Sequence, residues 1–159
     1  MNRLGARSTR PQRVTRAQVS ANLGPQYDPA GRVDLAPSRF TALRQFELWS
    51  CNALFADCTT EDGYNRIYAS AANAFPGDAP RPVAPTLLLR EFTFSPVQAT
   101  HLRLVVRNSQ CTGGPDFQGE QDADPFNATD CNEAGPASTR AVRAAELQVF
   151  GQPSLLQAG

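Results

Sequence analysis

Short runs in which apolar and polar residues alternate, separated by clusters of proline and glycine, make up most of this chain of 159 residues. In the stretch 13–23, Ala17, Val19 and Ala21 fall on one face, which is the period of a half-buried strand. Similar runs occupy 40–50, 87–94, 102–106 and 141–150. Proline and glycine between the runs end strands and begin turns, and the stretch 64–74 offers one or two helical turns at most. The pattern predicts an all-β sandwich.

Four cysteines fall into two pairs along the chain, Cys51 with Cys58 and Cys111 with Cys131. Disulfides at these positions would clip two loops and indicate an oxidising, extracellular compartment. Zinc binding is the alternative, but zinc sites normally bring cysteines together in Cys-x-x-Cys pairs, and none occurs here. Four cysteines allow three connectivities, and we favour the two local bridges because each stays between neighbouring strands.

The charge is balanced overall but unevenly distributed. Fifteen arginines offset 15 acidic residues, which argues against nucleic acid or an anionic membrane as the main partner. Arginines crowd the first residues, so we expect a solvated tail over 1–12, with an electrostatic binding arm as the alternative. A second tail is expected over 152–159. No run is apolar enough to insert into a membrane or to act as a signal peptide. If the cysteines are paired, we expect the export signal to lie upstream and the chain to be a processed piece or a fragment.

A recognisable pattern lies in the closing segments. Phe92–Arg107, followed after an excursion by Val142–Gly151, resembles the end of discoidin-like (coagulation-factor type C) domains, which belong to the galactose-binding-like jelly rolls. The segment Gln110–Cys131, together with Ala42–Glu47 and the Phe75-Pro-Gly turn, is similar to the version appended to secreted bacterial metallopeptidases of the fungalysin type. The resemblance implies a β-sandwich jelly roll over 13–151 that serves as an extracellular accessory domain.

The resemblance departs from the family at the front of the chain. Discoidin-like domains usually have several further strands before the one matched to 13–23, and here only residues 1–12 stand in their place. A sandwich without those strands would have an exposed sheet edge or an open core. We therefore expect a strand-edge contact, in which a second chain or the parent peptidase completes the sheet.

Catalytic motifs are missing from the sequence. It has one histidine, His101, and no His-Glu-x-x-His, Gly-x-Ser-x-Gly, P-loop or dinucleotide fingerprint. The zinc chemistry of a metallopeptidase needs ligands that this chain does not carry. His101 is expected to be a structural or exposed residue. The sequence predicts a non-catalytic module.

The acidic loop between Cys111 and Cys131 is the strongest candidate for a metal site. Asp122 and Asp124 supply the hard oxygen ligands that calcium prefers, although the spacing is not that of an EF-hand. The resemblance adds Glu146, because a glutamate of the last strand commonly contributes to a structural calcium site in such domains. A solvated acidic loop is the simpler interpretation.

Loop aromatics are the candidates for ligand recognition, because sugars stack on aromatic rings and pair with polar side chains. We single out three aromatics and two polar partners: Phe117, Phe126, Tyr64, Arg66 and Asn108. Phe55 lies inside the first clipped loop, and Trp49 is expected in the core or beside the first bridge. These residues suggest recognition of a glycan or cell-surface ligand for a larger secreted protein. The alternative is an interaction or stability domain without a free ligand, and loop aromatics exposed on one surface would favour the first.

Overall fold

The structure is a computed structural model, and its description is confined to part of the chain. The described residues are 4–21, 26–27, 33–34, 42–72, 74–75, 88–110, 142, 144 and 146–153. Four of the residues singled out above, Phe117, Phe126, Asp122 and Asp124, lie outside them, as do Cys111 and Cys131. Within the described ranges, no helix is long and apolar enough to cross a membrane.

The described part of the chain forms strands and no helix, as the alternating pattern predicted. The strands are β1 (Leu4–Ser20), β2 (Gln26–Tyr27), β3 (Val33–Asp34), β4 (Leu43–Cys51), β5 (Asn65–Ala69), β6 (Arg90–Ser109) and β7 (Glu146–Pro153). Five of them make one antiparallel sheet in the order β5-β4-β6-β1-β7, while β2 and β3 pair separately. The all-β prediction is confirmed.

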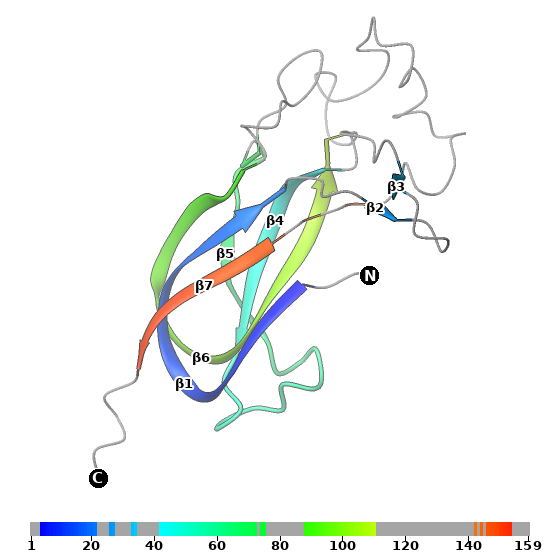
Figure 1. Cartoon of the computed structure of the whole chain (residues 1–159). Coiled ribbons are helices and arrows are strands. Elements are labelled where there is room, and N and C mark those ends of the chain that lie inside the picture. The colour runs from blue at the N-terminus through cyan, green and yellow to red at the C-terminus, as the bar shows by residue number, and fades with distance from the viewer. Residues whose placement is uncertain are drawn as a thin grey trace, which may run out of the picture.

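The sheet becomes two layers because its two central strands bend. β1 and β6 pair along most of their length, from Leu4 opposite Leu104 to Val19 opposite Arg90. Their register shifts between Arg7 and Gln12 and again between Val14 and Arg16. Pro11 and Pro96 fall in these irregular stretches, where the missing N–H of proline is tolerated. Figure 1 shows both strands curving through the lower end of the molecule.

Each half of the bent ribbon carries different neighbours. β4 pairs with β6 after the bend, from Cys51 opposite His101 to Leu43 opposite Ser109, and β5 pairs with β4 on its far side. β7 pairs with β1 after the bend, from Gln12 opposite Pro153 to Ser20 opposite Glu146. The inner faces of these two layers then face each other and form a sandwich (Figure 1).

Aromatic side chains fill the space between the layers. Phe46 of β4 is fully buried and meets Phe92, from the first half of β6, edge-on with ring centroids 4.8 Å apart. Tyr68 and Phe75 lie against the same pair, with centroids 5.9–6.3 Å apart. Burying one such ring is worth about 1.5–3 kcal/mol, with about 0.5–1.5 kcal/mol more for a well-oriented aromatic pair. These rings therefore pack the two layers of the sandwich against each other.

A smaller apolar cluster lies close to the bend. Val14, Ala99 and Leu102 are buried there, with Val149 of β7 packed against them. The irregular stretches of β1 and β6 that contain Pro11 and Pro96 are next to these buried residues in the sequence. This cluster forms the floor of the pocket described below.

Three expectations differ from the structure. Residues 4–12, expected as part of a solvated tail, are the first half of β1 and pair with β6. Residues 90–94 of the first expected run and the whole run 102–106, expected as separate strands, belong to the single bent strand β6. β5 occupies 65–69, where helical turns were the only regular structure considered. In each case pairing with a distant strand decides the local conformation, which local patterns do not show.

Candidate functional site

A short loop between β4 and β5 is clipped at the lower end of the sandwich. Cys51, the last residue of β4, is bonded to Cys58, and their Cα atoms are 5.7 Å apart. This bridge confirms one of the two predicted pairs. We call residues 51–58 the clipped loop; Figure 1 shows the β4–β5 connection at the end where β1 and β6 bend.

Hydrogen bonds hold the backbone of the clipped loop. The carbonyl oxygen of Asn52 accepts the N–H groups of Phe55 and Ala56 at 2.9 and 3.0 Å. The Asn52 side-chain oxygen accepts the N–H of Leu54 at 3.1 Å, an Asx-type turn. The N–H of Ala53 donates to Oγ1 of Thr100 at 2.8 Å. The loop is thereby tied to β6 as well as to itself.

A second turn packs on the first. The Asp57 carboxylate accepts hydrogen bonds from the hydroxyl of Thr59 at 2.6 Å and from its N–H at 2.8 Å. These bonds, the hydroxyl bond foremost, lower the pKa of Asp57 below its ordinary value. A Cβ atom placed on Gly63 would lie only 2.0 Å from the Asp57 carbonyl oxygen, so the close approach of the two turns requires glycine there.

Two apolar side chains stand at the tip of the clipped loop. Phe55 is 85% exposed and Leu54 is 59% exposed, although the backbone beneath them is fixed. Both belong to a segment of six residues between the bonded cysteines, which is too short to fold over its own side chains. The loop therefore presents an aromatic ring to solvent in a defined position.

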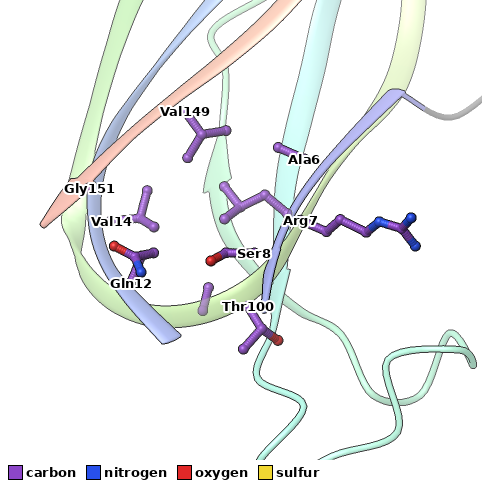
Figure 2. Close-up of a pocket in the computed structure, with 10 residues that line it drawn as sticks. Ala6, Arg7, Ser8, Gln12, Val14, Thr100, Val149 and Gly151 are labelled. Atoms are coloured by element: carbon purple, nitrogen blue, oxygen red, sulfur yellow. The ribbon is translucent and has the colours of Figure 1, made fainter. Parts of the chain in front are cut away.

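A pocket of about 230 Å³ opens beside the bend of β1 and β6. Val14, Leu102 and Val149 give it an apolar floor, and Ser8 and Gln12 add polar groups from the irregular stretch of β1. Figure 2 shows Val14, Val149, Ser8 and Gln12 around the hollow, while the Arg7 side chain extends away from it. An apolar cavity with a few polar groups is the usual form of a small-ligand site, although this one is smaller than the common range of about 300–1,000 Å³.

Thr100 connects the pocket to the clipped loop. It lines the pocket, and its side-chain oxygen also accepts the N–H of Ala53 and lies 3.3 Å from the carbonyl oxygen of Cys51. Nδ1 of His101 lies 2.8 Å from the same Thr100 oxygen. The single histidine thus takes part in a hydrogen-bond network at the base of the loop. We call the clipped loop and this pocket together the basal site.

The sequence singled out Tyr64, and the structure buries it. Tyr64 is 9% exposed, and the guanidinium of Arg103 lies 3.8 Å from the centre of its ring. Its ring is therefore not free for a sugar to stack on. Phe75 is fully buried as well, so Phe55 is the most exposed aromatic among the described residues.

Arg66 and Asn108 lie on the β5-β4-β6 layer, away from the pocket. Arg66 is opposite Trp49 in the β4–β5 pairing and donates to Glu47 at 3.0 Å. Asn108, at the other end of the layer, donates to Gln45 at 2.8 Å, and its buried Oδ1 has no partner within the described structure. Trp49 is half-buried on the outer face of the sheet rather than in the core. Trp49 is thus paired with Arg66 on β5 and with Arg103 on β6, and the Tyr64 ring packs against Arg103.

Glu146 opens β7 on the other layer. Its carboxylate is exposed and accepts a hydrogen bond from the Gln148 amide. In the ranges that the structure describes, no group of three or more histidine, cysteine, aspartate or glutamate residues could hold a metal ion. Glu146 belongs to no such group among the described residues. Asp122 and Asp124, the metal candidates of the acidic loop, lie outside the described residues.

Sequence reasoning did not find the basal site. Phe55 was noted as a loop aromatic, but Leu54, Ser8, Gln12 and Thr100 were not considered. The available signal was an apolar pair, Leu54-Phe55, inside a cysteine-clipped loop too short to bury it. No local pattern could have indicated the pocket, because it is formed by three strands that are distant in the sequence.

Comparison with known proteins finds similarity to solved structures. No protein-family model and no curated protein matches the chain. One similar structure is CBM32-1 from a family 31 glycoside hydrolase of Clostridium perfringens, with 12% identity and a TM-score of 0.39 over 68% of this chain and 59% of that one. Another is the family 32 carbohydrate-binding module of Streptococcus pneumoniae EndoD, with 19% identity and a TM-score of 0.37 over 71% of this chain and 60% of that one. The chain thus spans about 60% of the length of these two structures, both of which are carbohydrate-binding modules.

Proposed function

We propose that the chain is a non-catalytic, extracellular binding module that recognises a glycan or cell-surface ligand through the basal site. The observation that carries this proposal is the 85% exposure of Phe55 on a loop fixed by a disulfide and by backbone hydrogen bonds. A soluble protein exposes a large aromatic ring on an ordered loop at a cost in hydration. That cost is offset when the ring contacts a ligand.

The aromatic tip and the pocket of the basal site together offer the groups that a carbohydrate needs. A pyranose ring has an apolar face that stacks on an aromatic side chain and a rim of hydroxyls that need hydrogen-bond partners. Ser8 and Gln12 offer such partners at the pocket, and Ser8 already accepts the N–H of Arg10 at 3.3 Å. The volume of about 230 Å³ restricts the buried part of a ligand to a small group, such as one sugar ring.

Rigidity at the tip lowers the entropic cost of binding. A ligand that contacts Phe55 does not have to order the loop, because the Cys51–Cys58 bridge and the Ala53–Thr100 hydrogen bond already do so. As part of a larger secreted protein, even a weak module raises the local concentration of its parent at a surface. We propose a peptidase of the resembled fungalysin type as that parent.

A glycan array tests this function, with Phe55→Ala as the diagnostic variant. Leu89→Ala is the matched control, because Leu89 is also an exposed apolar residue (41%) but lies directly before β6, outside the basal site. We expect selective binding by the wild type and by Leu89→Ala, and a loss of about tenfold or more in Phe55→Ala. Equal binding by all three proteins, or no binding by a folded wild type, would contradict the proposal.

One observation favours a second function, an interaction domain. The first half of β1 pairs with β6 on one side, and within the described residues no strand pairs with its other side between Leu4 and Pro11. Such an edge can accept a strand from another chain. Hydrogen exchange measures this directly. Fast exchange of these amides in the isolated chain, slowed by the parent peptidase or at high protein concentration, would support the interaction role.

A further inference from the structure

The outer face of the β5-β4-β6 layer has its own arrangement of side chains. On β4, Phe46 and Leu48 point into the core, so Gln45, Glu47 and Trp49 project from the opposite face. This face is separate from the basal pocket, whose lining comes from β1, β6 and β7. The residues on it have no role in the function proposed above.

Glu47 is the centre of this face. Its Oε1 accepts Nη1 of Arg66 at 3.0 Å and lies 3.3 Å from Nε of Arg107, while its Oε2 accepts Nε1–H of Trp49 at 2.9 Å. The side chain of Glu47 is only 6% exposed beneath these partners. Burial alone would raise the pKa of Glu47, but the bonds from Trp49 and Arg66 and the charge of Arg107 outweigh it and lower the pKa.

The two arginines that Glu47 positions remain largely open to solvent. The Arg66 side chain is 56% exposed and that of Arg107 is 52% exposed. A guanidinium has five N–H donors, and the contact with Glu47 involves one nitrogen of each arginine. Because both contact the same carboxylate oxygen, their remaining donors are held close together. Two fixed guanidinium groups side by side can bind an anionic oxygen group by donating hydrogen bonds to it from both sides.

The face carries an excess of positive charge. Within β4, β5 and the part of β6 from His101 to Ser109, Glu47 is the single acidic residue. Arg103 adds a third arginine, directly opposite Trp49 and stacked on the Tyr64 ring at 3.8 Å. Three arginines around one buried carboxylate leave a net charge of about two positive units at this face, more than the neutralisation of Glu47 requires.

We propose that this face binds the acidic groups of a polysaccharide, carboxylate or sulfate, with Arg66 and Arg107 contacting the anion. Trp49 lies between Arg66 and Arg103 in the strand register, so an aromatic edge borders the cationic groups. A sugar ring that bears an acidic substituent offers both an apolar face for the aromatic ring and an anion for the arginines. The inference takes the ligand class, carbohydrate, from the proposed function, and takes the charge from the residues described here.

The experiment uses two pairs of oligosaccharides that differ only in charge. An oligogalacturonide is compared with its methyl-esterified form, and dextran sulfate with dextran. The test protein is Arg66→Gln/Arg107→Gln. Its matched control is Arg10→Gln/Arg13→Gln, which removes the same charge from exposed positions of β1. Far-UV circular dichroism and thermal melting verify that each variant is folded.

We expect the wild type to bind at least one acidic oligosaccharide about tenfold or more tightly than its neutral counterpart, with the difference falling as salt is added. Arg66→Gln/Arg107→Gln loses this difference, and the control keeps most of it. The inference is overturned if neither acidic ligand is preferred, or if both double variants behave alike. Equal binding of polyglutamate would show that charge alone is recognised, and the assignment to carbohydrate would be wrong.

The same measurements separate this inference from the proposed function. Phe55→Ala is expected to weaken binding of the neutral glycan found on the array while the preference for acidic ligands persists. If the array finds no neutral glycan, the proposal of ligand binding at the basal site is contradicted. The comparison of acidic with neutral ligands still decides the inference about the outer face.

Discussion

The side-chain oxygen of Thr100 lies 2.8 Å from the backbone nitrogen of Ala53 and accepts its hydrogen bond. This contact joins a pocket-lining residue of β6 to the loop that displays Phe55. The two parts of the basal site are therefore expected to respond together when the contact is removed.

Thr100→Val tests that coupling. The substitution keeps the shape of the side chain but leaves the Ala53 N–H without its partner, which should cost about 1–2 kcal/mol of unfolding free energy. Ligand binding should weaken as well, because the clipped loop loses its tie to the pocket. Urea denaturation and a binding titration measure the two effects. Thr93→Val, at an exposed position of the same strand, should change neither.

Removal of the first disulfide should destabilise the chain and loosen the tip. For a loop of this length, the chain-entropy estimate gives about 2.5 kcal/mol for Cys51→Ala/Cys58→Ala. Urea denaturation measures the free energy, and the binding loss for the array ligand should match or exceed that of Thr100→Val. An unchanged midpoint would mean that hydrogen bonds alone hold the loop.

Intact-mass measurement after alkylation also tests the second predicted bridge. With Cys51–Cys58 and Cys111–Cys131 both formed, no cysteine is alkylated before reduction and all four are alkylated after it. Two alkylated cysteines without reduction would leave the first bridge in place and exclude the second.

Glu47 should make the free energy of unfolding depend on pH in the acidic range. Its folded pKa lies below the ordinary value of 4.5, so its contribution is complete above about pH 4.5 and is lost as the pH falls through the folded pKa. At pH 7, Glu47→Gln should cost about 1–3 kcal/mol, because three donors lose a charged acceptor. The difference between wild type and variant should shrink below pH 4.5. A difference that stays constant from pH 7 to pH 3 would show that the carboxylate charge is not what stabilises the face.

Calcium is expected to bind through Asp122 and Asp124 of the acidic loop, and Glu146 at the start of β7 is the separate candidate. We expect the melting temperature to rise in excess calcium relative to a chelator, and Asp122→Asn/Asp124→Asn to abolish the rise. A smaller rise in Glu146→Gln would assign a ligand role to Glu146 as well. Identical melting curves with calcium and with chelator would remove the calcium proposal.

Much of the strand content was predictable because burial leaves a local signature. Ala17, Val19 and Ala21 alternate in the sequence and are all fully buried, and Leu102 and Leu104 follow the same rule. The pairing of Cys51 with Cys58 was predicted correctly, because the two cysteines are only seven residues apart and a bridge between them stays local to one turn. These features depend on residues close together in the chain.

What could not be predicted depends on distant partners. The arginine-rich stretch 4–12 has no clear alternation and extends the sheet only because β6 offers it a partner. Pro96 indicates the end of a strand, yet β6 continues through it because a bulge accommodates the missing donor. Glu47 is surrounded by arginines from two other strands, so its environment was invisible in the sequence.

The bent pair of β1 and β6 has a consequence for how the chain is made. β1 is synthesised before both of its partners, because β6 begins at Arg90 and β7 at Glu146. Until those segments have been synthesised, the longest run of backbone donors near the N-terminus has no strand to pair with. Contacts this distant in sequence slow folding. Folding of the module is therefore expected to wait until β7 has been synthesised, and a chaperone that binds extended segments would find a site in residues 4–20.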